Sequence, residues 1–168
     1  HAWTYGLDGR LLGVPDAKEM EDFDKADYPL KQAAVALWEG FVFVNLAEEP
    51  EPFVEAYAPL ISRFGRWNLG ALRAARRIDY DVQANWKILF QNYSECYHCS
   101  PVHPTLTKLS SPTSGENDLV DGPFLGGFMT VTTPGGSLTE SGRACGVPVA
   151  DLPDEDMQRV YYYTIFPN

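Results

Sequence analysis

Short apolar runs separated by turn residues dominate the first part of the chain. An Asp8-Gly9 pair stands between the apolar residues of segment 5–10 and predicts a tight turn between two short strands. Residues 15–30 are polar and acidic, and residues 33–46 then form two apolar runs that Glu39-Gly40 separates. This second pattern predicts a β-hairpin. We therefore expect the chain to begin with β-structure.

A run of glutamate and proline at residues 48–52 interrupts both the strand and the helix periodicity. Proline is tolerated in the first turn of a helix, because the amide there lacks a partner anyway. We place a domain boundary here and predict a helix over residues 53–64 and a loosely alternating strand over residues 73–82. Farther along, we expect a loop over residues 104–123, and Tyr161-Tyr162-Tyr163 predicts a strand with large side chains on both faces.

The segment from residue 85 to residue 103 has the clearest helical pattern. Asn85 is a suitable cap, and five large residues follow at helical spacing: Trp86, Leu89, Phe90, Tyr93 and Tyr97. On a continuous helix, Gln91, Glu95 and His98 lie together on the opposite face. The prediction is a helix with an apolar face and a polar face that carries a carboxylate and an imidazole.

A second histidine, His103, follows five residues after His98. Pro101 disfavours helical backbone at the residue before it, so the chain turns and the two imidazoles can meet. Two histidines with a nearby carboxylate suit a non-haem iron centre, which keeps open coordination positions for dioxygen and a substrate.

Other interpretations of this segment remain open. A helix face with glutamine, glutamate and histidine is commonly a solvated face. Cys96 and Cys99 could join His98 or His103 in a thiolate-rich zinc site, or a cysteine and a histidine could form a nucleophilic pair. Helical geometry counts against both, because neighbouring side chains point in different directions around the axis. We expect the two cysteines to pack as free thiols.

Composition narrows the functional classes. The chain has 168 residues, with 23 acidic and 13 basic side chains and a net charge of −10, which disfavours binding to nucleic acids and anionic lipids. No apolar run approaches the roughly 20 residues that span a bilayer. Three cysteines do not make an even disulfide framework, so we predict a reducing compartment, the cytoplasm.

Two motifs resemble a known family. The stretch N-W-K-I-L-F-Q-N-Y-S-E-C-Y-H-C-S-P-V-H-P, residues 85–104, is similar to the catalytic-iron motif of Rieske non-haem iron oxygenase alpha subunits, which include the ring-hydroxylating dioxygenases and related monooxygenases. The opening H-A-W-T-Y-G-L-D-G-R-L resembles the end of the Rieske cluster motif of that family. The motifs stand in the family's order, and the resemblance covers essentially the whole chain.

The resemblance implies an α+β fold and a division into two domains. Residues 1–50 would be the C-terminal part of an all-β Rieske iron-sulfur domain. Residues 51–168 would be the N-terminal part of a catalytic domain of the helix-grip, START-like type with an antiparallel sheet. We expect the sequence to be a fragment that lacks the start of the first domain and the end of the second.

The resemblance also implies roles for four residues. His98 and His103 would bind a mononuclear ferrous iron, whose third ligand in the family is an aspartate that we expect beyond Asn168. His1 would bind the outer iron of a two-iron two-sulfur Rieske cluster, whose other ligands we expect before residue 1. Glu95 takes the position of the carboxylate that bridges cluster and iron of neighbouring subunits for electron transfer. We assign no substrate-binding residue.

The identity of the bridging residue bears on the substrate. Most aromatic-ring dioxygenases carry aspartate there, whereas glutamate followed by C-Y-H-C resembles the branch that acts on quaternary ammonium compounds such as glycine betaine, carnitine or proline betaine. The implied enzyme is an oxygenase component, a homotrimer that uses dioxygen and electrons from NAD(P)H through a ferredoxin or flavin reductase for oxidative N-demethylation. The alternatives are hydroxylation of an aromatic ring and, in another class, a non-catalytic helix-grip binding module or a zinc-stabilised domain.

Overall fold

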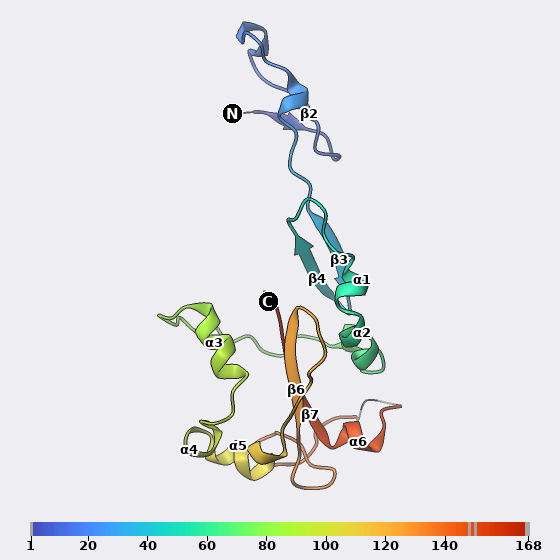
Figure 1. Cartoon of the computed structure of the whole chain (residues 1–168), viewed down its shortest axis with the longest axis vertical. Helices are drawn as coiled ribbons and strands as arrows, with labels where there is room; N and C mark the ends of the chain where they lie inside the picture. The colour runs from blue at the N-terminus through green and yellow to red at the C-terminus, as the bar shows by residue number, and fades with distance from the viewer. Residues whose placement is uncertain (1, 148, 150, 167–168) are drawn as a thin grey trace. The chain divides into compact units, whose positions relative to one another are not determined.

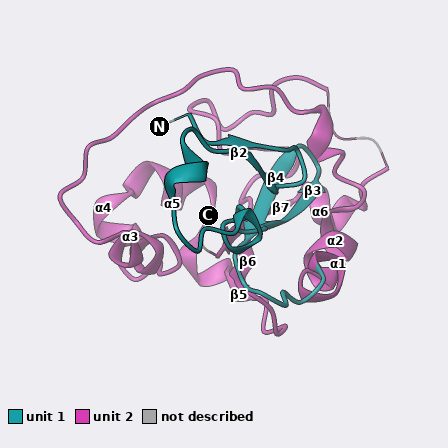
Figure 2. Cartoon of the chain, turned by 90° about the horizontal axis from the view of Figure 1, so that it is seen from above, with its two compact units in different colours: residues 1–52 teal, residues 53–168 magenta. Residues whose placement is uncertain are grey.

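The computed structural model of the chain describes residues 2–147, 149 and 151–166. It divides into two compact units, residues 1–52 and residues 53–168, which Figure 2 colours separately. The division falls close to the predicted boundary between residues 50 and 51. That the first unit ends a Rieske domain and the second begins a catalytic domain stays a prediction at this level.

The first unit begins with a small antiparallel pair, β1 (Thr4–Tyr5) and β2 (Leu11–Gly13). Gly9 lies in the turn between them with a φ of 82°, a left-handed conformation that glycine adopts without strain. The predicted tight turn between two strands is therefore confirmed. Two short 3-10 turns follow, η1 (Ala17–Glu19) and η2 (Lys25–Asp27).

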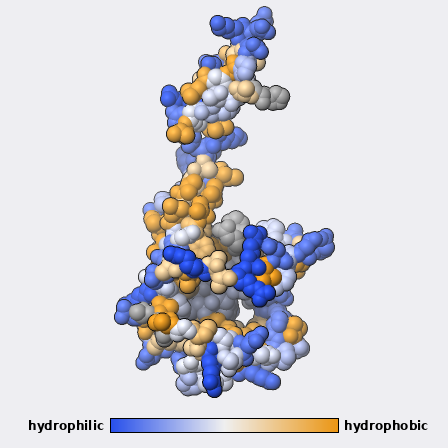
Figure 3. All heavy atoms as spheres, turned by 180° about the vertical axis from the view of Figure 1, so that it is seen from behind, coloured by the Kyte–Doolittle hydropathy of each residue, from blue (hydrophilic) through white to orange (hydrophobic). Residues whose placement is uncertain are grey.

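The second part of this unit is a hairpin of β3 (Ala34–Trp38) and β4 (Phe41–Asn45), as predicted. Glu39 and Gly40 form its two-residue turn with φ values of 49° and 86°, as in the type I′ turns that match strand twist. One face of the hairpin carries four exposed aliphatic side chains in register: Val35, Leu37, Val42 and Val44. Figure 3 shows hydrophobic surface over this hairpin.

The second unit opens with α1 (Phe53–Ala56) and α2 (Ala58–Phe64), which confirms the predicted helix, and η3 (Leu69–Ala71) follows. The predicted strand over residues 73–82 is wrong. These residues are exposed and have no regular structure, because no strand of the described residues runs beside them to complete a hydrogen-bonded ladder.

A three-stranded antiparallel sheet organises this unit. It consists of β5 (Glu116–Asn117), β6 (Phe124–Thr130) and β7 (Arg159–Ile165) in the order β5-β6-β7, with α6 (Asp154–Met157) leading into β7. The predicted tyrosine-rich strand is confirmed. A Cβ atom on Gly127 would lie 2.1 Å from the carbonyl oxygen of Glu116, so the close approach of β5 and β6 requires glycine at this position.

Helices lie on both faces of this sheet (Figures 1 and 2). On one face, the ring of Phe64 in α2 makes edge contacts with Tyr161 and Tyr163 of β7. On the other face, Phe90 of α3 (Trp86–Tyr93) contacts Phe166 just beyond β7. Side chains alternate along a strand, so β7 presents large residues to both helices.

Two short helices connect α3 to the sheet, α4 (Cys99–Val102) and α5 (Pro104–Leu109), and the turn η4 (Pro112–Ser114) follows. The predicted loop over residues 104–123 is wrong, since α5, η4 and β5 occupy much of it. Pro104 takes the first position of α5, where its missing amide costs nothing. Within the described part of the chain, no helix has the length and apolar character needed to cross a membrane.

Candidate metal centre

The helix α3 leads the chain to the candidate site. The side chain of Asn85 accepts a hydrogen bond from the Lys87 amide at 3.0 Å, which caps α3 as predicted. The helix ends at Tyr93, and the Ser94 amide donates to the carbonyl of Phe90. Continuation of this helix to Tyr97 is therefore a wrong prediction, and Tyr97 is 96% exposed.

The chain turns after α3 because the Glu95 side chain and two cysteines hold it there. One carboxylate oxygen of Glu95 accepts a hydrogen bond from the Tyr97 amide. The Cys99 amide donates to the carbonyl of Cys96, and the two cysteines form a disulfide. Local side-chain bonds of this kind compete with helical ones, which ends the helix.

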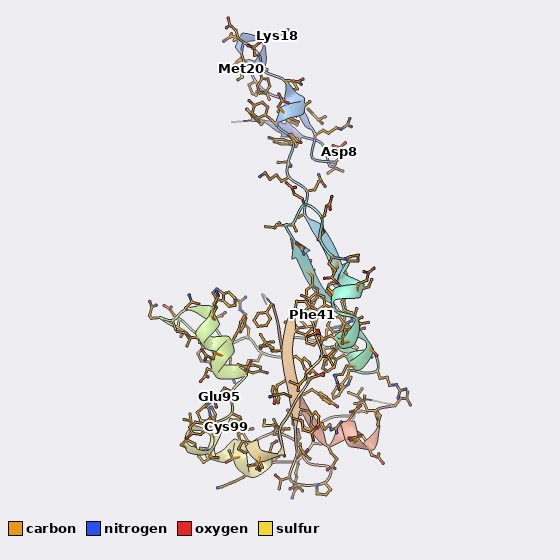
Figure 4. All side chains as sticks on the ribbon, in the orientation of Figure 1. Asp8, Lys18, Met20, Phe41, Glu95 and Cys99 are labelled. Atoms are coloured by element: carbon orange, nitrogen blue, oxygen red, sulfur yellow. A yellow bond between two sulfur atoms is a disulfide. The ribbon has the colours of Figure 1, made fainter. Side chains whose placement is uncertain are left out.

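Glu95 and His98 meet across this turn. The Oε2 atom of Glu95 lies 3.2 Å from Nδ1 of His98. The hydrogen bond with His98 is the main cause that lowers the pKa of the Glu95 carboxyl, and the Tyr97 amide adds to it. The predicted association of the two residues holds, but not through a shared helix face. Figure 4 marks Glu95 in the segment between α3 and α5.

His98 and His103 lie at the two ends of α4, as its N-cap and C-cap residues. Their ring centroids are 5.3 Å apart, with an angle of 73° between the ring planes. The Val102 amide donates to the carbonyl of His98, and the His103 amide donates to the carbonyl of Cys99. This single helical turn brings the two imidazoles together. The predicted break of helical backbone before Pro101 is wrong, because Pro101 lies in the first turn of α4, where its missing amide needs no partner.

The spacing of the two rings fits a shared metal ion. A metal about 2.1 Å from one nitrogen of each imidazole, with the two ligands roughly 90–110° apart, places the ring centroids about 5 Å apart. The contact of Nδ1 with Glu95 leaves Nε2 of His98 for the metal, and a carboxylate behind a metal-bound imidazole is a common arrangement. The donor set of His98, His103 and a supporting Glu95 therefore fits an iron ion.

The described residues supply only part of a coordination sphere. No group of three or more histidine, cysteine, aspartate or glutamate side chains in the described ranges is arranged to hold a metal ion. The third iron ligand beyond Asn168 stays a prediction. His1, the predicted cluster ligand, lies outside the described residues.

The disulfide corrects the prediction that Cys96 and Cys99 are free thiols. It also removes the zinc alternative as the structure stands, because both sulfurs are bonded to each other and neither is a thiolate. The C-x-x-C spacing is visible in the sequence, but a helix predicted to continue to Tyr97 gives no sign of the turn in which the two sulfurs meet. Cys145 is free and exposed.

The aromatic cluster at β7 already has cationic partners from the chain. The guanidinium carbon of Arg63 lies 5.8 Å from the ring centroid of Tyr161, and that of Arg159 lies 3.8 Å from the centroid of Phe128. Asp118 bonds to Arg63 at 2.7 Å and accepts the Tyr163 hydroxyl at 2.6 Å. This cluster is packing on the α2 face of the sheet, and Asp118 serves there as a partner of Arg63 and Tyr163.

The family model for the ring hydroxylating alpha subunit (catalytic domain) matches residues 69–168. The glycine betaine monooxygenase oxygenase subunit of Chromohalobacter salexigens is 40% identical over 107 residues, which cover 63% of this chain and 24% of the relative. The carnitine monooxygenase oxygenase subunit of Acinetobacter pittii is 38% identical over 109 residues, which cover 62% of this chain and 29% of the relative. The anthranilate 1,2-dioxygenase large subunit of Acinetobacter baylyi is 29% identical over 183 aligned positions, which cover 99% of this chain and 38% of the relative.

Solved structures agree with the fold. An inhibitor complex of the quaternary ammonium Rieske monooxygenase CntA matches with a TM-score of 0.66 and 24% identity over 99% of this chain and 41% of that chain. The α+β fold class is thereby confirmed. CntA in complex with L-carnitine matches with a TM-score of 0.56 and 29% identity over 77% of this chain and 37% of that chain. The chain thus spans well under half the length of the relatives it matches.

Proposed function

This chain belongs to the ring hydroxylating alpha subunit family, and from that premise we propose that it carries part of the mononuclear iron site of a Rieske-type oxygenase. The family prediction is confirmed. The observation that carries the proposal is the convergence of His98 and His103 at 5.3 Å between ring centroids, with Glu95 on Nδ1 of His98.

The chain's own residues would do three things at this site. His98 and His103 hold the iron and set the angle between two of its ligands. Glu95 accepts a hydrogen bond from Nδ1 of His98, which fixes the ring tautomer and raises the basicity of Nε2. Bound ferrous iron supplies the one-electron chemistry that activates dioxygen.

Glu95 also has the position for an electron-transfer bridge in the proposed whole enzyme. We propose that electrons pass from NAD(P)H through a ferredoxin or flavin reductase to a two-iron two-sulfur Rieske cluster, with His1 among its ligands. A cluster histidine of a neighbouring subunit in a homotrimer would bond to the carboxylate of Glu95. One carboxylate oxygen is engaged by His98 and the other by the Tyr97 amide, so these two contacts orient the carboxylate.

Quaternary ammonium compounds are the proposed substrates. Support comes from the curated relatives named glycine betaine monooxygenase and carnitine monooxygenase, and from glutamate at position 95. Hydroxylation of an N-methyl group would give a carbinol that breaks its C–N bond. The products are formaldehyde, a proton and a tertiary amine, which keeps the nitrogen's electron pair.

Hydroxylation of an aromatic ring is the second candidate. It is favoured by one observation, the similarity to the anthranilate dioxygenase large subunit over 99% of the chain. Glycine betaine and anthranilate therefore distinguish the two candidates. Oxygen uptake with one formaldehyde per glycine betaine supports the first, and oxygen uptake with anthranilate without formaldehyde supports the second.

The experiment uses the full-length oxygenase with ferrous iron and a compatible reductase. His98→Ala and His103→Ala should each remove mononuclear iron and product formation while the Rieske cluster keeps its visible absorption. Lys108→Ala, on the exposed side of the neighbouring helix α5, is the matched control. A wild-type protein without iron that still binds a betaine would favour a non-catalytic binding module instead.

The cytoplasm stays our proposed compartment. The disulfide does not contradict it, because the disulfides of cytosolic proteins are usually transient and serve in catalysis or redox sensing.

A further inference from the structure

We propose that Cys96 and Cys99 form a reversible thiol–disulfide switch that positions Glu95 and His98 for iron binding. The inference rests on the proposed iron site and adds a modification site to it. Its basis is the placement of the disulfide, which closes a four-residue turn that contains His98 and directly follows Glu95.

The two cysteines of the disulfide alternate with the residues of the site along the chain. Glu95 precedes the first cysteine, His98 lies between the two, and the carbonyl of Cys99 accepts the amide hydrogen of His103 at 2.8 Å. Cys99 is 6% exposed and is thus anchored in the fold. Figure 4 labels it near Glu95. A covalent bond from Cys96 to this anchored residue holds the turn that brings Glu95 to His98.

Without the disulfide, few contacts hold the same turn. The side chain of Tyr97 is almost fully exposed, and the carboxylate of Glu95 is about half exposed. Hydrogen bonds at this level of exposure contribute little, and opening the bond restores conformational freedom to the turn. Reduction should therefore make the distance between the Glu95 carboxylate and His98 Nδ1 longer and more variable.

The pair has the features of an exchangeable disulfide. Cysteines in a C-x-x-C arrangement exchange readily with external thiols. Cys96 is half-buried, whereas Cys99 is buried, so an external thiol reaches Cys96 first. A compartment that keeps most thiols reduced would supply dithiol reductants, and disulfides found there are commonly switches.

The step balances as a two-electron exchange with a dithiol. A thiolate of the dithiol attacks the sulfur of Cys96 and displaces Cys99 as a thiolate, which takes up a proton. The second thiol of the reductant then displaces Cys96 and closes its own disulfide. The S–S bond of the protein breaks, and two electrons and two protons pass from the dithiol to the two cysteines.

The first measurement determines the redox state by peptide mass. Trypsin releases residues 88–108 as one peptide with both cysteines, and Cys145 falls in another peptide, residues 144–159. The full-length oxygenase is equilibrated with dithiothreitol at graded ratios of reduced to oxidised reagent and alkylated. We expect residues 88–108 to change between no alkyl group and two, reversibly, while Cys145 is alkylated throughout.

The second measurement is ferrous affinity, titrated without oxygen after removal of dithiothreitol. We expect the reduced protein to bind iron about tenfold more weakly than the oxidised protein, the lower end of the effect of losing support behind a metal ligand. Cys96→Ser should bind ferrous iron as weakly as the reduced protein does, with or without dithiothreitol treatment. This variant leaves the buried Cys99 unchanged. Cys145→Ser should behave as wild type.

The outcomes separate this proposal from the function it rests on. Equal ferrous affinity in the two redox states, or two alkylated cysteines in the air-oxidised peptide 88–108, overturns the switch and leaves the oxygenase proposal standing. Failure of both states to bind ferrous iron overturns the iron site itself, and the switch falls with it.

Discussion

Glu95 and His98 are three residues apart, and the carboxylate oxygen Oε2 lies 3.2 Å from the ring nitrogen Nδ1. The pair forms across a turn rather than along a helix. Because this contact uses Nδ1, the other ring nitrogen of His98, Nε2, is left for a metal. The ring centroids of His98 and His103 are 5.3 Å apart. Nine residues of chain, 95–103, thus bring a carboxylate and two imidazoles close together.

Replacement of Glu95 by alanine tests whether this carboxylate carries electrons. With saturating ferrous iron, we expect Glu95→Ala in the complete enzyme to keep both metals but to uncouple oxidation of the Rieske cluster from product formation. The reason is that the variant keeps the imidazole ligands and loses the group that would bond to the neighbouring cluster histidine. Cluster absorbance and formaldehyde release, measured together, give the result.

Glu140→Gln is the control for loss of a negative charge, because Glu140 is exposed and lies in the loop before β7. It should turn over normally. Full turnover by Glu95→Ala would contradict the bridging role, and iron that no longer binds at saturating concentration would make Glu95 a support for His98 alone.

The cap of α3 offers a prediction on stability. The Asn85 side chain accepts the Lys87 amide at 3.0 Å at the start of the helix that leads to the site. Asn85→Ala should lower the free energy of unfolding by about 1 kcal/mol, the usual effect of losing such a cap, and Asn85→Asp should retain most of it. Urea denaturation of the full-length protein measures both. An alanine variant as stable as the aspartate variant would show that the cap contributes nothing.

Local turn chemistry explains what could be predicted from the sequence. The hairpin follows from two apolar runs that a pair containing glycine separates, and both turn residues, Glu39 and Gly40, have a positive φ. The meeting of His98 and His103 follows from their spacing, because the single turn of α4 separates them. Pro101 does not break this turn, since it lies in the first turn of α4, where an amide needs no helical partner. Each of these features depends on a few adjacent residues, so the local sequence contains everything needed to predict it.

Contacts that form only in three dimensions explain the wrong predictions. The helical spacing that runs on to Tyr97 gives no sign that the Glu95 side chain takes the Tyr97 amide or that Cys96 bonds to Cys99. The strand expected at residues 73–82 has the right alternation, but a strand exists only beside another one. The iron roles of the two histidines, in turn, rest on the family resemblance, because two histidines five residues apart are not specific by themselves.

The ion pair of Arg63 and Asp118 joins α2 to the loop before β6, and its removal should be costly. Asp118 is 12% exposed at its side chain and bonds both Arg63 and Tyr163. Asp118→Ala leaves a partly buried guanidinium and a phenol without their acceptor. We expect a loss of about 1–3 kcal/mol, because Arg63 is 35% exposed and water screens part of the effect.

Asp121→Ala, three residues farther along in the same exposed loop, is the matched control and should change stability little. Both variants are measured by urea denaturation. An Asp118 variant that unfolds like the Asp121 variant would show that the pair is only a surface contact.

The phenol of Tyr163 makes stability depend on pH at the alkaline end. Burial, and then the hydrogen bond to Asp118, raise the pKa of Tyr163 above the ordinary value of about 10. The unfolded chain therefore releases this proton at a lower pH than the folded protein does. The stabilisation is fully present below about pH 10 and is lost as the pH rises through the raised pKa of the folded state.

Phenolate absorbance in the near ultraviolet measures this directly. Burial also raises the pKa of Tyr57, Tyr161 and Tyr162, so several tyrosines should ionise late in the folded protein. Tyr163→Phe should reduce this late step by one tyrosine and flatten the fall of stability above about pH 10. Tyr80→Phe, which removes an exposed phenol, should leave the late step in place. A late step of unchanged size in Tyr163→Phe would contradict the raised pKa of Tyr163 and its hydrogen bond to Asp118.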